Sequence, residues 1–154
     1  MVLLGLVCAL VSAVGAVFGW VAWTGRQTAT IAIPADTAAP LDVARAYVAA
    51  INAHDCHAAR SVTVADSVDM TTTWCTNVRS LAVSEWRTPL VESSGYYGRT
   101  APQEVTYVPV SMTVAWRPFH DDGSMSSAGV ITWGYVLVRE NAEAPWRVAD
   151  QGVG

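Results

Sequence analysis

Residues 104–117, EVTYVPVSMTVAWR, alternate between apolar and polar or small side chains, and this alternation decides the fold class of the chain. A period of two residues is typical of a β-strand with one buried face. Pro109 has no backbone N–H to donate, so it marks a sheet edge or a bulge. The side chains predicted to face the core are Val108, Val110, Met112, Val114 and Trp116.

The same pattern continues on both sides of this stretch. Asp121-Asp122-Gly123 predicts a turn, and residues 126–139 predict a returning strand that is apolar on both faces. A strand of that kind is central in its sheet and covered on both sides, or covered on one side by a partner. Residues 146–150 predict a last strand after a turn, residues 78–86 an earlier strand, and residues 88–103 a loop.

Helical periodicity precedes the strands. Apolar residues recur at helical spacing over residues 41–53, and Pro40 suits the first helical position. Asp55 is placed to cap a second short helix over residues 56–62, whereas residues 64–76 are ambiguous. Helices followed by an antiparallel meander predict an α+β domain.

The N-terminal stretch VLLGLVCALVSAVGAVFGWVAW, residues 2–23, carries no charge, and 18 of its 22 residues are apolar. A helix of that length spans roughly 33 Å, slightly more than the hydrocarbon core of a bilayer. Trp20 and Trp23 suit the headgroup region, and Gly15-x-x-x-Gly19 would allow two such helices to pack closely. We therefore expect a transmembrane anchor over residues 1–24 that contacts the membrane through residues 2–23.

A cleaved signal peptide is the alternative to an anchor. The apolar run is longer than a typical h-region, no basic segment precedes it, and no clear cleavage site follows it. Residues 25–40, rich in Ala, Thr and Pro, predict a linker between the bilayer and a domain over residues 41–154.

The formal net charge is −4, and all nine basic residues are arginines, which indicates a GC-rich genome. Because the sequence contains no basic run, neither nucleic acid nor anionic lipid is expected as a partner.

The cysteines indicate the compartment. Cys8 lies within the predicted anchor, whereas Cys56 and Cys75 form an even pair 19 residues apart. We expect a disulfide between them, with two separate buried thiols and metal ligation as the alternatives. Arg26 alone would place the domain in the cytoplasm, but the cysteine pair favours a single-pass plasma-membrane protein with its C-terminal domain outside the cytoplasm.

Two segments carry a family resemblance. The helix that begins DVARAYV at Asp42 and ends in NAHD at Asp55 resembles the start of nuclear-transport-factor-2-like domains. WGYVLVR (133–139) followed by PWRVAD (145–150) resembles their end, so the likeness covers roughly residues 41–150. The nearest likeness is to small membrane-anchored members from GC-rich bacteria, and it implies a cone in which a curved antiparallel sheet wraps N-terminal helices around a pocket.

The resemblance leaves the function open, because the superfamily contains isomerases, dehydratases and cyclases as well as non-enzymatic domains of type IV secretion and conjugation assemblies. Enzymes of this fold place an acid–base residue in the pocket, for which Asp55 and its neighbour His54 are the candidates. The same position suits a helix cap, which we favour. Tyr47, Trp116 and Trp133 are candidates for lining the pocket, although aromatic residues at such positions are more often core.

Metal and cofactor sites are not expected. His54, Asp55, Cys56 and His57 are potential metal ligands, but no second cluster completes a set, and His120-Asp121-Asp122 is interpreted as a turn. The sequence thus favours a non-catalytic interaction or assembly domain in an envelope complex of the secretion or conjugation type. It would bind protein partners or form a homodimer through its sheet. The alternative is a small enzyme or carrier for an apolar ligand.

Overall fold

A computed structural model gives the fold and describes residues 12, 14–20, 23–92, 103–119 and 129–153. The helices of the domain are α2 (Pro40–Ala53), α3 (Cys56–Ser61), the short 3₁₀ helix η1 (Ala65–Ser67) and α4 (Val68–Asn77). The strands are β1 (Val78–Trp86), β2 (Leu90–Glu92), β3 (Glu104–Trp116), β4 (Ile131–Arg139) and β5 (Arg147–Val153). The predicted α+β order, helices before strands, is confirmed.

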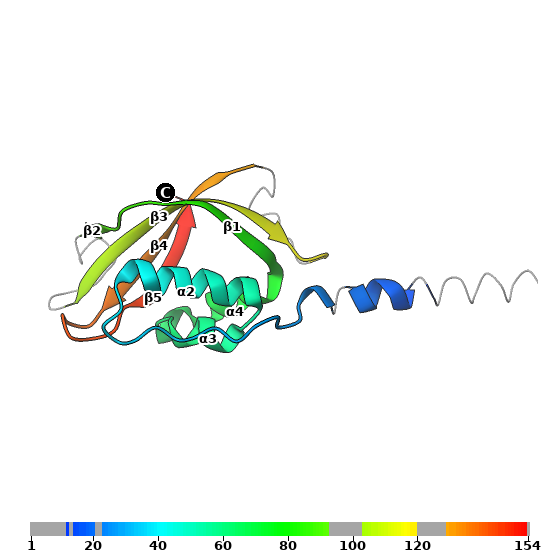
Figure 1. The fold of residues 1–154 in the computed structure, drawn as a ribbon, viewed down its shortest axis with the longest axis horizontal. Coiled ribbons are helices and arrows are strands. Elements are labelled where there is room, and N and C mark those ends of the chain that lie inside the picture. The colour runs from blue at the N-terminus through cyan, green and yellow to red at the C-terminus, as the bar shows by residue number, and fades with distance from the viewer. Residues whose placement is uncertain (1–11, 13, 21–22, 93–102, 120–128, 154) are drawn as a thin grey trace, which may run out of the picture.

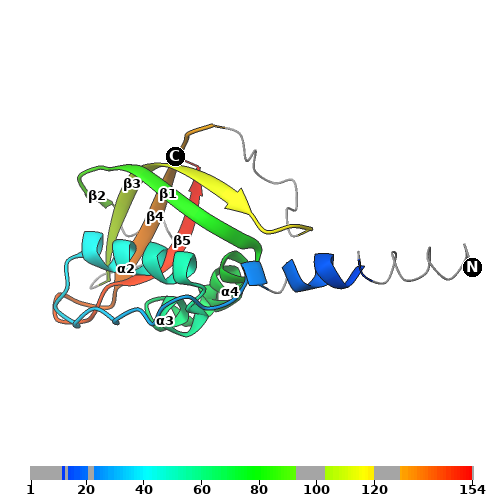
Figure 2. The same ribbon diagram turned by 45° about the vertical axis from the view of Figure 1, so that its right-hand side comes forward.

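The strands form one antiparallel sheet in the order β1-β3-β4-β5, and β2 pairs with the first part of β3. The sheet is curved, and α2, α3 and α4 lie on its concave face (Figures 1 and 2). β4 lies between β3 and β5 and is therefore central, as its two apolar faces predicted.

The core lies between the sheet and the helices. The predicted face of β3 is buried there, with Val108, Val110 and Met112 fully enclosed, and it meets Trp133, Tyr135 and Leu137 of β4. A smaller cluster of Val105, Val136 and Val138 packs on the opposite face of the sheet. This second cluster explains why β4 is apolar on both sides.

Several boundaries differ from the predictions. Residues 64–76 hold η1 and α4, although three consecutive threonines, Thr71–Thr73, disfavour a helix. The buried Thr71 and Cys75 anchor α4 to the core, so tertiary packing outweighs propensity. β2 lies within the predicted loop 88–103, and β5 extends beyond residue 150 to Val153.

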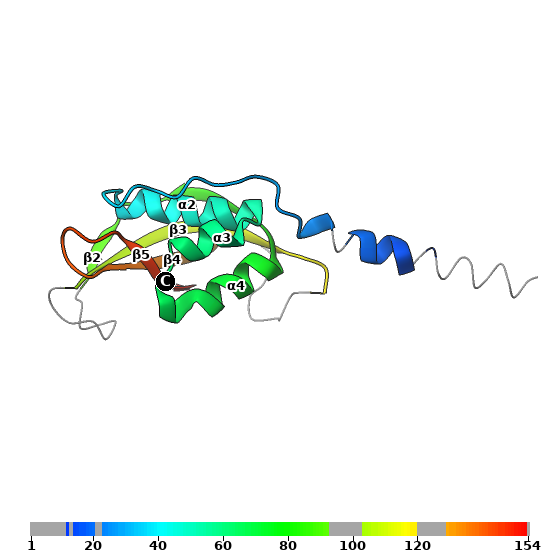
Figure 3. The same cartoon turned by 90° about the horizontal axis from the view of Figure 1, so that it is seen from below.

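The predicted linker is a packed part of the domain. Residues 27–39, here called the strap, have no regular secondary structure but run alongside α2 (Figures 1 and 3). The N–H of Thr28 donates to Ala53 O at 2.9 Å, and Ile31 and Ala38 pack against the core. The strap is therefore held to the domain at these points, while most of its residues are exposed.

Most of the predicted anchor 2–23 lies outside the described residues. Its described residues 14–20 are helical, exposed and extend away from the domain (Figure 2). Within the described part of the chain, no helix is long and apolar enough to cross a membrane.

Candidate functional site

The predicted pocket-lining residues belong to the interior of the domain. Tyr47 and Trp133 are buried in the core, and Trp116 is partly buried against it. Trp74 lies between the two other indoles, with ring centroids 5.7 Å from Trp116 and 5.2 Å from Trp133. These three rings form one aromatic cluster of the core, and Trp116 also lines a hollow at the end of β3.

A polar network surrounds the hydroxyl of Tyr47. Thr71 lies 3.4 Å away, and Gln151 of β5 donates to the hydroxyl from its amide nitrogen at 3.3 Å. Thr71 in turn lies 3.0 Å from the hydroxyl of Thr63. Burial raises the pKa of Tyr47 to about 12 despite these hydrogen bonds, so the phenol stays protonated at neutral pH.

The carboxylate of Asp55, the candidate acid, accepts hydrogen bonds from two backbone N–H groups. Oδ1 accepts the N–H of Ala58 at 3.1 Å and caps α3, as predicted. Oδ2 accepts the N–H of Ile31 in the strap at 2.9 Å. The N–H groups of Ile31 and Ala58 hold the pKa of Asp55 below its usual value, which is the opposite of what a proton donor at neutral pH requires.

His54 also has a structural position. It ends α2 in the left-handed conformation with φ 52°, and its backbone N–H reaches the last carbonyls of that helix. Its Nδ1 lies 3.2 Å from the carbonyl oxygen of Cys75 at the end of α4. His54 therefore links the ends of two helices.

The predicted disulfide is present. Cys56 at the start of α3 is bonded to Cys75 of α4, with Cα atoms 5.7 Å apart. Among the described residues, no three His, Cys, Asp or Glu side chains gather as a metal site would require. The predicted turn His120-Asp121-Asp122 lies outside those residues.

A hollow at the edge of the domain was not predicted from the sequence. It has a volume of about 520 Å³, combines apolar and charged side chains, and is here called the Arg139 hollow. Val91 of β2 is 90% exposed on its wall. The lining residues are Pro40, Pro89, Val91, Glu92, Gln103, Glu104, Val105, Thr106, Arg139 and Trp146.

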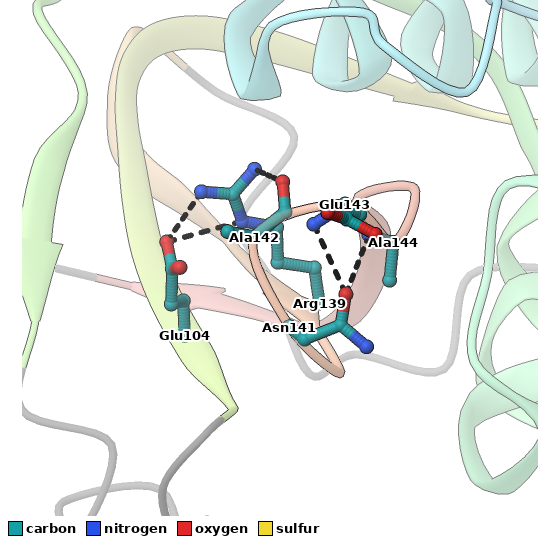
Figure 4. A network of polar contacts seen from close by, with 6 residues as sticks. All are labelled: Glu104, Arg139, Asn141, Ala142, Glu143 and Ala144. Carbon is teal, nitrogen blue, oxygen red and sulfur yellow. Dashed lines mark hydrogen bonds and ion pairs between the residues drawn. The ribbon is translucent and has the colours of Figure 1, made fainter.

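Three neighbours fix the guanidinium of Arg139 in this hollow, and Figure 4 shows two of them, Glu104 and Ala142. Its Nε and Nη2 donate to Glu104 Oε2 at 3.0 and 2.6 Å, directly across the β3–β4 ladder. Its Nη1 donates to Ala142 O at 2.8 Å, and its guanidinium lies 4.7 Å from the ring centre of Trp146. Such a side chain gives a rigid rim to a hollow that combines apolar and charged side chains.

The turn beside Arg139 is braced as well. Asn141 Oδ1 accepts the N–H groups of Glu143 and Ala144, each at 3.0 Å (Figure 4). This turn and the strap line a second hollow of about 490 Å³ on the other side of Arg139 and Trp146. Asn141 after a predicted strand is a turn signal in the sequence. The pairing of Glu104 with Arg139 could not be predicted, because it depends on the register of β3 and β4.

The comparisons with known proteins give a family and no activity. Neither a curated protein nor a solved structure matches the chain significantly. A family model described as a domain of unknown function (DUF4829) matches residues 42–152, from the first turn of α2 to β5. The chain therefore belongs to the DUF4829 family.

Proposed function

We propose that the protein is a non-catalytic interaction domain that is tethered to the plasma membrane and faces the outside of the cytoplasm. The observation that carries the proposal is the position of Asp55 and His54. Both candidate catalytic side chains are engaged with backbone groups of their own domain. Neither Tyr47 nor Trp133 lines the Arg139 hollow or the hollow on its other side.

Two further observations support the tether and the compartment. The apolar stretch 2–23 is long enough for a bilayer-spanning helix. A disulfide such as Cys56–Cys75 persists in an oxidising compartment and is rare in a reducing cytosol. A nuclear-transport-factor-2-like identity is part of the proposal and is supported by helices packed on the concave face of a curved antiparallel sheet.

We place the interaction surface at the Arg139 hollow, with a protein segment as its occupant. The rim combines the exposed apolar side chain of Val91 with an arginine whose position is already fixed. Preorganised side chains lose little conformational freedom on binding, which favours recognition at such a rim. An envelope assembly of the secretion or conjugation type is the context that we propose.

The tether and the compartment can be tested with a C-terminally tagged full chain in a bacterial host. The expected result is tagged protein in the membrane fraction, with its N-terminal segment retained and its C-terminus digested by protease in intact protoplasts. Tagged protein in the aqueous fraction, or a C-terminus protected in protoplasts, would contradict the tether or the orientation.

The interaction surface can be tested by site-specific photocrosslinking in the same cells. A crosslinker at Val91 is expected to give a discrete adduct, which is absent with the crosslinker at Val130, exposed but outside the hollow. An adduct of twice the chain mass would identify self-association, and another mass a different partner. Equal patterns at the two positions would contradict the assignment of the surface.

One observation favours the alternative function, an apolar ligand inside the domain. Trp133 Nε1 and Gln151 Oε1 are buried, and neither has a hydrogen-bond partner among the described residues. A bound molecule could satisfy such atoms. Saturable changes in tryptophan fluorescence with apolar ketones or fatty acids, lost in Trp133→Phe, would support a carrier or enzyme over the interaction domain.

A further inference from the structure

The end of the domain next to the apolar stretch contains two adjoining hollows. The first, of about 250 Å³, is lined by residues from the anchor end, the strap, α2 and β1. The second, of about 490 Å³, lies at the end of β3. Arg79 lines both hollows, so they share a wall. The first is lined by Trp23, Thr24, Arg26, Thr28, Asn52, His54 and Arg79, and the second by Arg79, Val114, Ala115, Trp116, Arg117, Pro118 and Phe119.

Arg117 joins this end of β3 to the segment just before the strap. Its guanidinium lies so close to Gly25 that a side chain at that position would collide with it. Its Nη1 donates to Thr76 O at 2.7 Å, and its backbone N–H donates to Asn77 O at 2.8 Å. The residues Trp23, Arg26, Arg79, Arg117 and Phe119 therefore belong to one surface, here called the anchor-proximal face.

Two backbone irregularities shape this face. Arg79 lies at a β-bulge, because β1 pairs Val78 with Trp116 and Ser80 with Ala115. A bulge redirects the side chain of the extra residue. Phe119 has φ 63°, a strained conformation for a bulky side chain, and it is 87% exposed. Strain of this kind is found at functional positions.

The chemistry of the face is cationic and aromatic. Among the described residues, no acidic side chain lines either hollow and no ion pair involves Arg26 or Arg79. His120, Asp121 and Asp122 follow Phe119 and lie outside the described residues. Trp23 is 71% exposed beside the two arginines.

We infer that the anchor-proximal face lies on the bilayer surface and binds the phosphates of anionic lipids, with Phe119 and Trp23 in the headgroup layer. This inference rests on the proposed membrane tether and adds a lipid preference to it. Tryptophan at the membrane interface and arginine beside anionic headgroups are the pairing that such surfaces favour. The sequence argued against anionic lipid because it has no basic run, but the fold brings together arginines from positions 26, 79 and 117.

The inference can be tested with the full chain in lipid nanodiscs, with and without phosphatidylglycerol in a phosphatidylcholine bilayer. The measurement is amide hydrogen exchange of residues 78–81 and 116–119. Exchange there is expected to be slower in the anionic discs and to lose this difference at high salt, because screening weakens surface attraction. Each arginine is expected to strengthen the attraction about fivefold.

The matched variants are Arg26→Gln/Arg79→Gln and Arg45→Gln/Arg87→Gln. All four arginines are at least partly exposed, but Arg45 and Arg87 pair with Asp42 and Glu85 away from this face. Only the first variant should lose the difference between the two lipids. Insertion into both discs with equal exchange, or an equal effect of the two variants, would overturn the inference and leave the tether intact. A chain that does not enter the discs would instead overturn the tether, and this inference with it.

Discussion

The carboxylate of Asp55 holds the backbone of Ile31, 24 residues earlier in the chain, at 2.9 Å while its other oxygen caps α3. One side chain thus fixes the strap to the helical layer and also caps the first turn of α3. The strap would otherwise have few backbone partners, because it forms no regular secondary structure.

Asp55→Ala removes both hydrogen bonds and is expected to lower the free energy of unfolding by about 2–3 kcal/mol, since a lost cap costs about 1 kcal/mol and a charged hydrogen bond about as much or more. Chemical denaturation measures the change. Asp42→Ala is the control, because Asp42 is exposed in a surface ion pair and should cost less than about 1 kcal/mol. Similar losses in the two variants would contradict the role of Asp55.

The stability of the domain should fall in acid partly through Asp55. The N–H groups of Ile31 and Ala58 lower the pKa of Asp55 in the folded protein. Its contribution is therefore complete above the unfolded pKa of about 4 and is lost as the pH falls through the folded value. Asp55→Asn should be less stable than the parent near pH 6, and the gap should narrow below about pH 4. A gap that stays constant with pH would contradict this assignment.

The sequence predicted the elements whose pattern is local. The strand at Val78–Trp86 and the helix beginning at Pro40 follow from periodicity and proline position. The Asp55 cap and the disulfide follow from residue type and spacing. In each case the determining residues lie within a few positions of the feature or are the only cysteines after the predicted anchor.

The missed features depend on contacts between distant residues. α4 forms against the preferences of its threonines because Thr71 and Cys75 are buried in the core. The Arg139 hollow requires the β3–β4 register, and the anchor-proximal face requires the β-bulge at Arg79. Arg26, close to Trp23 in the sequence, was a local signal for the anchor-proximal face. The sequence spacing gave no indication that Arg79 and Arg117 lie on the same face.

A side chain at Gly134 would force the ring of Tyr107 to move, because an added Cβ would collide with that ring on the neighbouring strand. Gly134→Ala is expected to cost about 1–3 kcal/mol, the usual range for overpacking. Gly152 lies directly opposite in β5 and has open space around its Cα, so Gly152→Ala is the matched control with an effect under about 1 kcal/mol.

The same collision predicts a coupling between the two residues. Tyr107→Ala removes the ring, so adding Gly134→Ala to it should cost less than Gly134→Ala alone. Thermal or chemical unfolding of the four proteins gives the interaction energy. Additive effects would show that the ring does not limit this position.

Loss of the disulfide should destabilise the domain without changing its fold. Cys56→Ala/Cys75→Ala releases a cross-link between residues 19 positions apart, and a loop of about that length gives roughly 3 kcal/mol of stabilisation. Chemical unfolding of the oxidised parent and of the double variant, compared side by side, measures the loss in the free energy of unfolding. Cys8→Ala is the control, because Cys8 is predicted to be an apolar side chain of the anchor, and it should leave the unfolding of the domain unchanged.

The rim of the Arg139 hollow should depend on the shape of the guanidinium and not only on its charge. Arg139→Lys keeps the positive charge but cannot hold Glu104, Ala142 O and the Trp146 ring together. Stability should fall by about 1 kcal/mol, because the Arg139–Glu104 pair is partly exposed, and the crosslink from Val91 should weaken. Arg87→Lys changes a more exposed arginine paired with Glu85 outside the hollow and should leave both measurements unchanged. If the crosslink from Val91 forms at full yield in Arg139→Lys, the partner does not depend on the guanidinium of Arg139. The apolar wall at Val91 would then be sufficient for binding.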